Sequence, residues 1–516
     1  AASLRWSLAN RAAVVLIALF AAGANVYVFN RLPSELAPLE DRGVLFGIAI
    51  APEGATIDYT DAYVRQVEAI YDTVPERREV FVATGFPIVT NAFSVLLLDD
   101  WNERTRSVRQ IQGELFGKFQ QVAGTLVFPV APPSLGAGPA ERPINLVIMD
   151  SRSYEEMNGS VQVFLARVAE NPRLLSIDTD LRINTPQLLV TMNRDRIGAL
   201  GLDVATVGQT IETMLGGREV TRFTQNGEQY DVIVQAAESE RASPEQLNRY
   251  FVRAPAGDLI PLSAVVDVVE TVTPRERNHF NRARSVTVEA DLAPGYSMGD
   301  ALAFLQQVAE ETLPATASIG YDGQSLEFFE SGASLYLTFG LALVFIFLVL
   351  AAQFESFIDP TIIMLTVPLS AIGALLALQF TGNSLNVYSQ IGLITLVGLI
   401  TKNGILITEF ANQLQDAGRQ KAEAIVEAST LRLRPILMTA LSMILGTLPL
   451  AFAAGAGAES RHQIGWVVVG GLALGTFFSV YVVPVAYSFI ARDREKRPNL
   501  DYDAIEAGKV KPAPAE

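Results

Sequence analysis

Six long apolar runs constrain this chain more than any other feature of its sequence. A helix rises about 1.5 Å per residue, so roughly 20 apolar residues cross the hydrocarbon layer of a bilayer. The runs cover residues 12–29, 334–352, 360–380, 387–410, 435–454 and 464–490. We therefore expect an integral membrane protein whose spanning part is an α-helical bundle of six spans.

The long segment between the first two runs has ordinary globular composition and must fold outside the lipid. Strand-like and helix-like patterns alternate along it. The strands are expected at residues 44–50, 78–83, 94–98, 145–149, 188–192 and 230–235, and the helices at 56–74, 153–170 and 204–215. Strand, helix, strand units with short connections predict an α+β domain built of small β-α-β sandwiches of the ferredoxin-like kind.

The positions of Lys and Arg near the span ends predict the orientation. Basic residues precede the first span and occur between residues 419 and 434 and between 492 and 497, whereas the connections 381–386 and 455–463 carry only Arg461. We therefore expect cytoplasmic termini and a large domain on the opposite side. The first run is also compatible with a cleaved signal peptide, which would place the domain on the same side.

Composition excludes several classes of function. The 39 basic and 55 acidic residues give a net charge of −16, which argues against nucleic acid as a partner. The chain has no cysteine and two histidines, His279 and His462, and its eight methionines are scattered, so we expect no metal site and no cofactor. Residues 295–299 match the G-x-S-x-G pattern, but the helix-like stretch that follows makes Ser297 an N-cap, and no enzyme is predicted.

Lys402 is the most informative residue of the spans. It interrupts the stretch 391–407, which is otherwise apolar apart from Thr395, Thr401 and Asn403. A cation at that depth is costly unless it is paired, so such residues usually face a protein interior and mark ion pathways. The alternative is a lysine whose ammonium group extends to the membrane surface.

A buried Lys402 needs a carboxylate, and the span interiors contain none. Glu355, Asp359 and Glu409 all lie near span ends. The partner is therefore expected outside this sequence, and the membrane part is expected to be incomplete alone. The hydroxyl of Thr439 has two possible roles, a polar cluster with Lys402 and Asn403 or a hydrogen bond to its own helix.

Apolar side chains also gather between residues 81 and 95. They either fill the core of a sandwich or line an apolar ligand cleft. The residues are Phe81, Ala83 and Gly85 on one strand face, Phe86 and Ile88 on the adjoining turn, and Phe93 and Val95 on the returning strand.

Four runs together resemble the C-terminal half of resistance-nodulation-division transporters, in the hydrophobe and amphiphile multidrug efflux branch. The runs are 31–34 (RLPS) with 40–43 (EDRG), 399–407 (LITKNGILI), 432–439 (RLRPILMT) and 455–457 (GAG). Their order and spacing agree with the family across nearly the whole chain. The sequence is compatible with a split subunit, a fragment or part of a longer polypeptide.

The resemblance implies a trimeric, proton-driven inner-membrane exporter of hydrophobic drugs or amphiphiles. Two membrane carboxylates of the N-terminal half would face Lys402, and a periplasmic adaptor and an outer-membrane channel would complete the assembly. The relay positions of the family fall on Lys402, Arg432 and Thr439, with Asn403 beside them. Alternatives are a metal-ion or lipid exporter of the same architecture, or a non-transporting, membrane-anchored assembly or binding subunit.

The resemblance also implies a domain order. It assigns residues 1–31 to the first span, 32–130 to one porter subdomain, 131–214 with 275–324 to a second, 215–274 to a docking subdomain, 330–492 to five further spans and 493–516 to a cytoplasmic tail. Drug-pocket positions of the family fall on Phe81, Ala83, Phe86, Ile88 and Val95. The loop after Gly85 is shorter than is usual, and Ile88 and Val95 stand where aromatic residues are usual.

Overall fold

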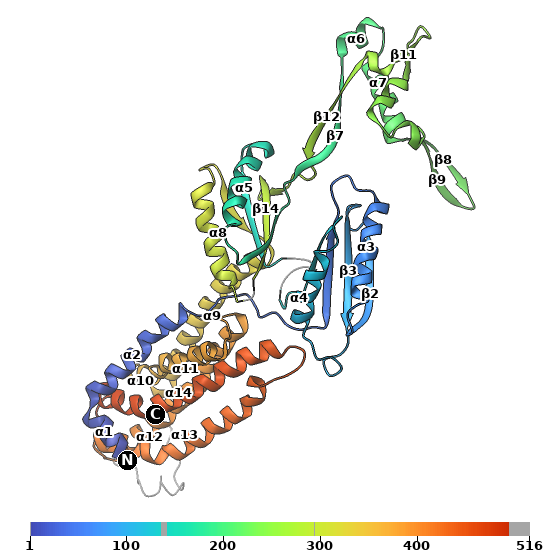
Figure 1. The fold of residues 1–516 in the computed structure, drawn as a ribbon. Helices are drawn as coiled ribbons and strands as arrows, with labels where there is room; N and C mark the ends of the chain where they lie inside the picture. The colour runs from blue at the N-terminus through green and yellow to red at the C-terminus, as the bar shows by residue number, and fades with distance from the viewer. Residues whose placement is uncertain (1, 136–141, 294, 495–516) are drawn as a thin grey trace. The chain divides into compact units, whose positions relative to one another are not determined.

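The computed structural model describes residues 2–135, 142–293 and 295–494. The chain divides into two compact units, one formed by Ala1–Asp180 with Asn278–Glu516 and one by Leu181–Arg277 (Figure 1). Of the expected tail at 493–516, residues 495–516 lie outside the described residues. The first unit holds the membrane helices and two strand-rich subdomains.

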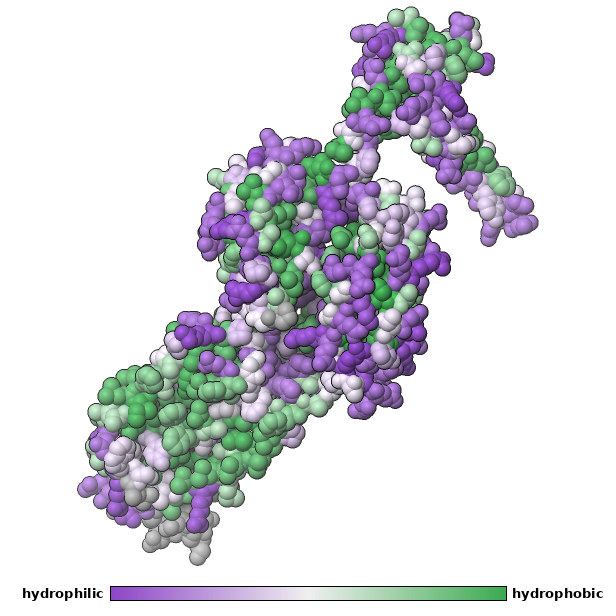
Figure 2. Space-filling model, viewed as in Figure 1, coloured by the Kyte–Doolittle hydropathy of each residue, from purple (hydrophilic) through white to green (hydrophobic). Residues whose placement is uncertain are grey.

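Six spans in the described part of the chain are long and apolar enough to cross a membrane, as the sequence predicted. They follow the short helix α1 (Ala2–Ala9). The spans are α2 (Arg11–Phe29), α9 (Gly323–Phe354), α10 (Ile358–Met364) with α11 (Thr366–Thr381), α12 (Val387–Asp416), α13 (Lys421–Ala451) and α14 (Ala458–Ile490). Figure 2 shows hydrophobic residues over the faces of these helices that are in view.

The predicted start of the fifth span at residue 435 is wrong. The helix begins at Lys421, and Pro435 lies inside it. The turns before Pro435 are polar, so an apolarity criterion omits them although the backbone continues as helix. A proline inside a spanning helix is tolerated where neighbouring groups satisfy the freed backbone carbonyl.

Glycines let α11 and α14 approach each other closely. A Cβ added at Gly373 would lie 2.5 Å from the carbonyl oxygen of Gly470, and one added at Gly470 would lie 2.4 Å from the Cβ of Ala377. Small residues at such crossings are the usual means of packing helices in lipid. Buried Leu369, Leu375 and Leu472 extend the same contact.

The first strand-rich subdomain follows α2. Its chain order is β1 (Val44–Ile50), α3 (Ile57–Tyr71), β2 (Arg77–Thr84), β3 (Asn91–Leu98), α4 (Val108–Phe119) and β4 (Leu126–Val130). The antiparallel sheet has the order β2-β3-β1-β4. Alternate residues of β3, among them Ala92 and Leu96, are buried in one core with apolar residues of α3 and α4. The two helices therefore cover one face of the sheet.

A second sheet repeats this order with a long interruption. Its elements are β5 (Ile144–Asp150), α5 (Tyr154–Val168), β6 (Leu174–Thr179), β13 (His279–Phe280), β14 (Ala283–Leu292), α8 (Met298–Thr312) and β15 (Ser318–Tyr321). β14 lies between β5 and β6, and β15 pairs with the other edge of β5. Ser297 caps α8 by accepting a hydrogen bond from the Asp300 amide at 3.1 Å, which confirms its structural role.

The second unit is inserted between β6 and β13. Its longest feature is an antiparallel ribbon in which β7 (Ile183–Met192) pairs with β12 (Val266–Pro274). It also contains α6 (Arg194–Ala199), α7 (Val204–Ile211), a π-turn at Glu212–Gly216, β8 (Arg218–Gln225), β9 (Glu228–Val234), β10 (Phe251–Arg253), β11 (Leu259–Pro261) and three 3₁₀ turns (Glu238–Glu240, Pro244–Arg249, Leu262–Ala264). Val207, Leu262 and Val265 are fully buried in its core.

The boundary expected at residue 215 therefore falls inside this unit. The sequence assigned the strand at 188–192 and the helix at 204–215 to a porter subdomain. The structure instead pairs β7 with β12, and the core of the second unit includes Val207 of α7. The unit begins at Leu181 because β7, which follows it, pairs with β12 in the ribbon and not with a strand of the β5–β15 sheet.

Candidate functional site

Lys402 lies in the middle of α12 on a face that this chain leaves exposed, whereas Thr401 and Asn403 on either side are buried. No carboxylate among the described residues forms an ion pair with its ammonium group. A cation at mid-span that faced lipid would cost roughly 2.5–3.5 kcal/mol. The exposed face of Lys402 is therefore suited to contact another membrane segment that carries negative charge.

Asn403 points into the bundle, away from that face. It is fully buried, and its Nδ2 donates to the Thr476 hydroxyl of α14 at 3.1 Å. Its Oδ1 is buried without a hydrogen-bond partner among the described residues. Adjacent residues of a helix do not share a face, so the structure separates Asn403 from Lys402 although the sequence groups them.

Thr439 lies on α13 and follows the second of its two expected alternatives. Its hydroxyl donates to the Ile436 carbonyl of its own helix at 3.2 Å. Arg432, two turns earlier, places its guanidinium 4.3 Å from the centre of the Phe410 ring. Its Nε is buried and has no hydrogen-bond partner in the part of the chain that the structure describes. Arg432 is thus a second cation of the spans without a carboxylate of its own here.

Three of the five expected drug-pocket residues lie on the sheet face that α3 and α4 leave free. Phe81 and Val95 are directly paired across β2 and β3, as are Ala83 and Phe93. Phe81 is 62% exposed, whereas Ala83 and Val95 are half-buried. Phe81, Ala83 and Val95 therefore lie outside the helix-covered core, because β3 directs the alternate set of side chains into it.

This free sheet face continues across β1 and β4. Phe46 is paired with Val95, and Ile48 with both Phe93 and Phe128. The rings of Phe46 and Phe93 stack with centroids 5.4 Å apart. Phe86 on the turn is exposed and Ile88 is half-buried. The structure thus brings Phe81, Ala83 and Val95 together with Phe46, Ile48, Phe93 and Phe128 on an apolar surface.

The segment between α2 and β1 joins the bundle to the first subdomain. Ser34 forms a parallel bridge with Leu385, and the Leu385 amide donates to the Pro33 carbonyl at 2.8 Å. The Ser384 hydroxyl donates to the Glu35 carboxylate. The segment is therefore fixed to the connection between α11 and α12. Lys402 lies in α12.

Two further acids fix the other end of this segment. The buried Arg104 donates from Nη1 to Asp41 at 2.9 Å, and the Val108 amide at the start of α4 donates to the same carboxylate at 2.8 Å. Glu40 accepts a hydrogen bond from Ser460 in the first turn of α14. Asp41 and Glu40 belong to the run 40–43 that carries part of the family resemblance, but no sequence pattern links them to Arg104 and Ser460, which lie far along the chain.

A family model described as the AcrB/AcrD/AcrF family matches residues 1–491. The chain belongs to this family. An uncharacterized transporter of Haemophilus influenzae is 35% identical over 499 residues, which are 95% of this chain and 48% of that protein. The multidrug/solvent efflux pump membrane transporter MepB of Pseudomonas putida is 33% identical over 499 residues, which are 94% of this chain and 47% of MepB.

The multidrug resistance protein MdtF of Escherichia coli K12 is 33% identical over 490 residues, 92% of this chain and 47% of MdtF. The chain thus spans about half the length of the curated relatives it matches. The match confirms the resemblance to resistance-nodulation-division transporters, which are not enzymes. Together with its six apolar spans, it makes this member of the AcrB/AcrD/AcrF family a multi-pass membrane protein.

Glu35 is expected to make the stability of this family member depend on pH. Burial raises the pKa of Glu35 above 4.5, against the opposing hydrogen bonds from Ser384 and Asn386. The folded state therefore binds more protons than the unfolded state, so this contribution to stability is full at low pH and is lost as pH rises through the raised pKa. In Glu35→Gln the thermal unfolding midpoint is expected to fall less than in the wild type as pH rises from about 4.5 to neutral.

The measurement is thermal unfolding of the purified protein in detergent across that pH range. The control is Glu68→Gln, which removes an exposed carboxylate of α3 and is expected to keep the wild-type profile. A Glu35→Gln profile parallel to that of the wild type would contradict the assignment.

Proposed function

We propose that this chain is the C-terminal half of a proton-driven exporter of hydrophobic and amphiphilic compounds. The observation that carries the proposal is Lys402, a mid-span cation whose exposed face has no carboxylate partner among the described residues. An N-terminal half that supplies membrane carboxylates opposite Lys402 would satisfy this charge. Relatives of about twice the length are consistent with such a second half.

The ion pair would act as the proton switch. While the acids are ionised, they attract Lys402, because opposite charges interact strongly where water is excluded. A proton taken up by the acids removes that attraction, and α12 is then free to shift against its neighbours. Arg432, Thr439 and Asn403 are proposed as supporting relay positions. Asn403 would transmit the shift to α14 through its hydrogen bond to Thr476.

Two connections would pass this movement to the outer subdomains. α9 starts directly after β15, with Asp322 as its N-cap, so the span and the second sheet are joined without a loop. The segment after α2 contacts the connection before α12 through Ser384 and the first subdomain through Arg104. A displacement of α12 is therefore conveyed to the strands through short polar contacts rather than through flexible chain.

The free apolar face of the first sheet is the proposed substrate surface. Phe81, Ala83, Phe86, Ile88 and Val95, with the stacked Phe46 and Phe93, present aromatic and aliphatic groups without a fixed polar partner. Such a surface suits varied amphiphiles better than metal ions, which need oxygen, nitrogen or sulfur ligands. The names of MepB and MdtF, a multidrug/solvent efflux pump and a multidrug resistance protein, support this class of substrate.

The wider assembly follows from the same proposal. The two sheets are ferredoxin-like porter subdomains on the periplasmic side of a bacterial inner membrane, and the second unit is the docking subdomain. Three copies, a periplasmic adaptor and an outer-membrane channel would complete the export route. The repeated β-α-β-β-α-β order of the two sheets supports the assignment of paired porter subdomains.

The test is transport by the assembled protein in proteoliposomes. Dye movement should accelerate when a proton gradient is imposed and return to background after a protonophore is added. A sodium gradient of the same size, imposed without a pH difference, distinguishes proton coupling from coupling to another cation. Transport that persists after the gradient collapses, or that requires ATP, would exclude this function.

A further inference from the structure

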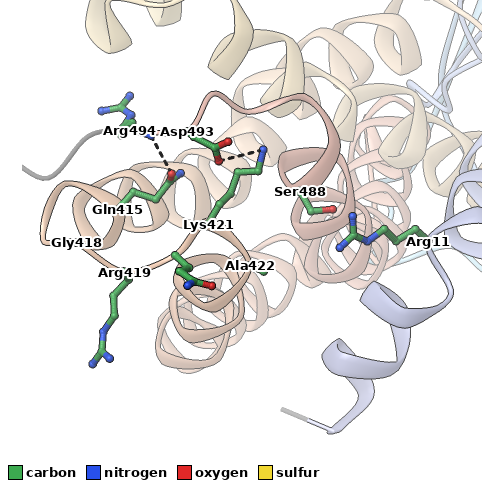
Figure 3. A pocket seen from close by; sticks show the side chains of 10 residues that line it. Arg11, Gln415, Gly418, Arg419, Lys421, Ala422, Ser488, Asp493 and Arg494 are labelled. Atoms are coloured by element: carbon green, nitrogen blue, oxygen red, sulfur yellow. Dashed lines mark hydrogen bonds and ion pairs between the residues drawn. The ribbon is translucent and has the colours of Figure 1, made fainter.

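A cavity lies at one end of the bundle, where α2 and α13 begin and α12 and α14 end. Its volume is about 570 Å³. The lining residues come from the start of α2, the end of α12, the connection to α13, the start of α13, and the end of α14 with the residues after it. They are Arg11, Gln415, Gly418, Arg419, Gln420, Lys421, Ala422, Ser488, Asp493 and Arg494 (Figure 3). None of these residues belongs to the proposed relay or to the apolar sheet face.

The lining contains four cations and one carboxylate, that of Asp493. Three of the cations have ion-pair partners. Lys421 lies 3.6 Å from Asp493, Arg494 lies 3.3 Å from Asp359 and 3.4 Å from Asp416, and Arg419 lies 3.6 Å from Glu427. Arg494 and Arg419 direct their guanidinium groups away from the other lining side chains in Figure 3.

Arg11 differs from the other three cations. Its Nε donates to the Leu8 carbonyl at 3.0 Å, and its guanidinium lies 5.4 Å from the centre of the Phe489 ring. Among the described residues, no carboxylate pairs with it. In Figure 3 the guanidinium points toward Ser488 at the cavity wall. Arg11 therefore offers guanidinium donors and a charge that the protein part described here does not neutralise.

The cavity lies where lipid headgroups are expected. Arg11 is the first residue of the span α2, Lys421 is the first residue of α13, and Ser488 lies in the last turn of α14. Beside Ser488, Phe489 is 57% exposed and Ile490 is 44% exposed. A headgroup in the cavity would thus leave its acyl chains against apolar side chains of α14, which a soluble anion could not use.

We propose that this cavity binds the phosphate group of an anionic phospholipid. Arg11 and Lys421 would contact the phosphate oxygens, whereas Arg419 and Arg494 are already paired with carboxylates. Basic pockets between spanning helices are a recognised form of headgroup site, and guanidinium groups suit phosphate because they donate two parallel hydrogen bonds. The site would tie α2, α13 and α14 together at this membrane surface.

Lipid titration of the purified transporter, followed by native mass spectrometry, tests the proposal. Phosphatidylglycerol and phosphatidylethanolamine with identical acyl chains are compared, since they differ in headgroup charge. Arg11→Gln and Lys421→Gln are each expected to weaken phosphatidylglycerol binding about fivefold, which corresponds to about 1 kcal/mol per basic side chain near an anionic surface. Phosphatidylethanolamine carries the same phosphate together with a cationic ammonium, so it is expected to bind more weakly than phosphatidylglycerol and to lose less affinity in both variants.

The matched control is Arg461→Gln, which removes an exposed arginine at the opposite end of α14 and is expected to leave lipid binding unaltered. Arg11→Lys keeps the charge and should retain most of the preference for phosphatidylglycerol over phosphatidylethanolamine. This variant tests the site even if the glutamine variant fails to assemble. Equal binding of the two lipids, or wild-type binding by both glutamine variants, would overturn the site. Full competition by glycerol 1-phosphate, which has the headgroup chemistry without acyl chains, would assign the cavity to a soluble phosphate and overturn the lipid.

Discussion

Replacing Lys402 with alanine in the assembled transporter is expected to reduce dye efflux to the background of vesicles without protein. The substitution removes the only cation on the exposed face of mid-α12 that the described residues provide. Proton uptake by the opposing acids would then change no ion pair, so protonation could no longer move α12. The measurement is dye efflux from proteoliposomes under an imposed proton gradient, with protein content matched by quantitative blotting.

Two variants make this result specific. Lys118→Ala removes a lysine of α4 that pairs with Glu114 at 2.6 Å, and it is expected to leave efflux unchanged. Lys402→Arg keeps the charge but replaces a compact ammonium with a planar guanidinium, so partial activity with an altered pH profile is expected. Undiminished efflux by Lys402→Ala would rule out the proton-relay role, provided that the variant elutes as the same assembly as the wild type.

The local patterns of the sequence were sufficient for the elements that local chemistry determines. The strand at 44–50 is confirmed residue for residue as β1, and all six apolar runs are confirmed as spans. The cap at Ser297 is also confirmed, because an N-cap depends on a residue and its next three neighbours. The missing carboxylate partner of Lys402 could also be inferred, because the sequence alone shows that the span interiors contain no Asp or Glu.

Features that depend on distant partners could not be predicted. Asn403 contacts Thr476 rather than Lys402, and only the packing of α12 against α14 decides which face it occupies. Glu35 meets Ser384, and Asp41 meets Arg104, across long stretches of chain that have no shared pattern. The extent of the second unit followed from the pairing of β7 with β12, which alternating apolarity alone leaves open.

The close crossing of α11 and α14 leads to the second large effect. Gly470→Ala is expected to destabilise the bundle by about 1–3 kcal/mol, the usual cost of overpacking. The added Cβ would lie 2.4 Å from the Cβ of Ala377 and 2.6 Å from the Gly373 carbonyl oxygen. Because the obstacles are a backbone carbonyl and a methyl group, no side-chain rotation relieves them, and the helices must move apart. The unfolding midpoint in detergent should fall accordingly.

Gly340→Ala is the matched control, since a Cβ at this position of α9 would meet nothing within 4 Å. Alanine is a better helix former than glycine by up to about 1 kcal/mol, so this variant should be as stable as the wild type or slightly more stable. The opposite signs of the two changes separate a packing effect from a general effect of alanine. Equal unfolding midpoints for Gly470→Ala and Gly340→Ala would mean that α11 and α14 are not held at the close approach that their glycines allow.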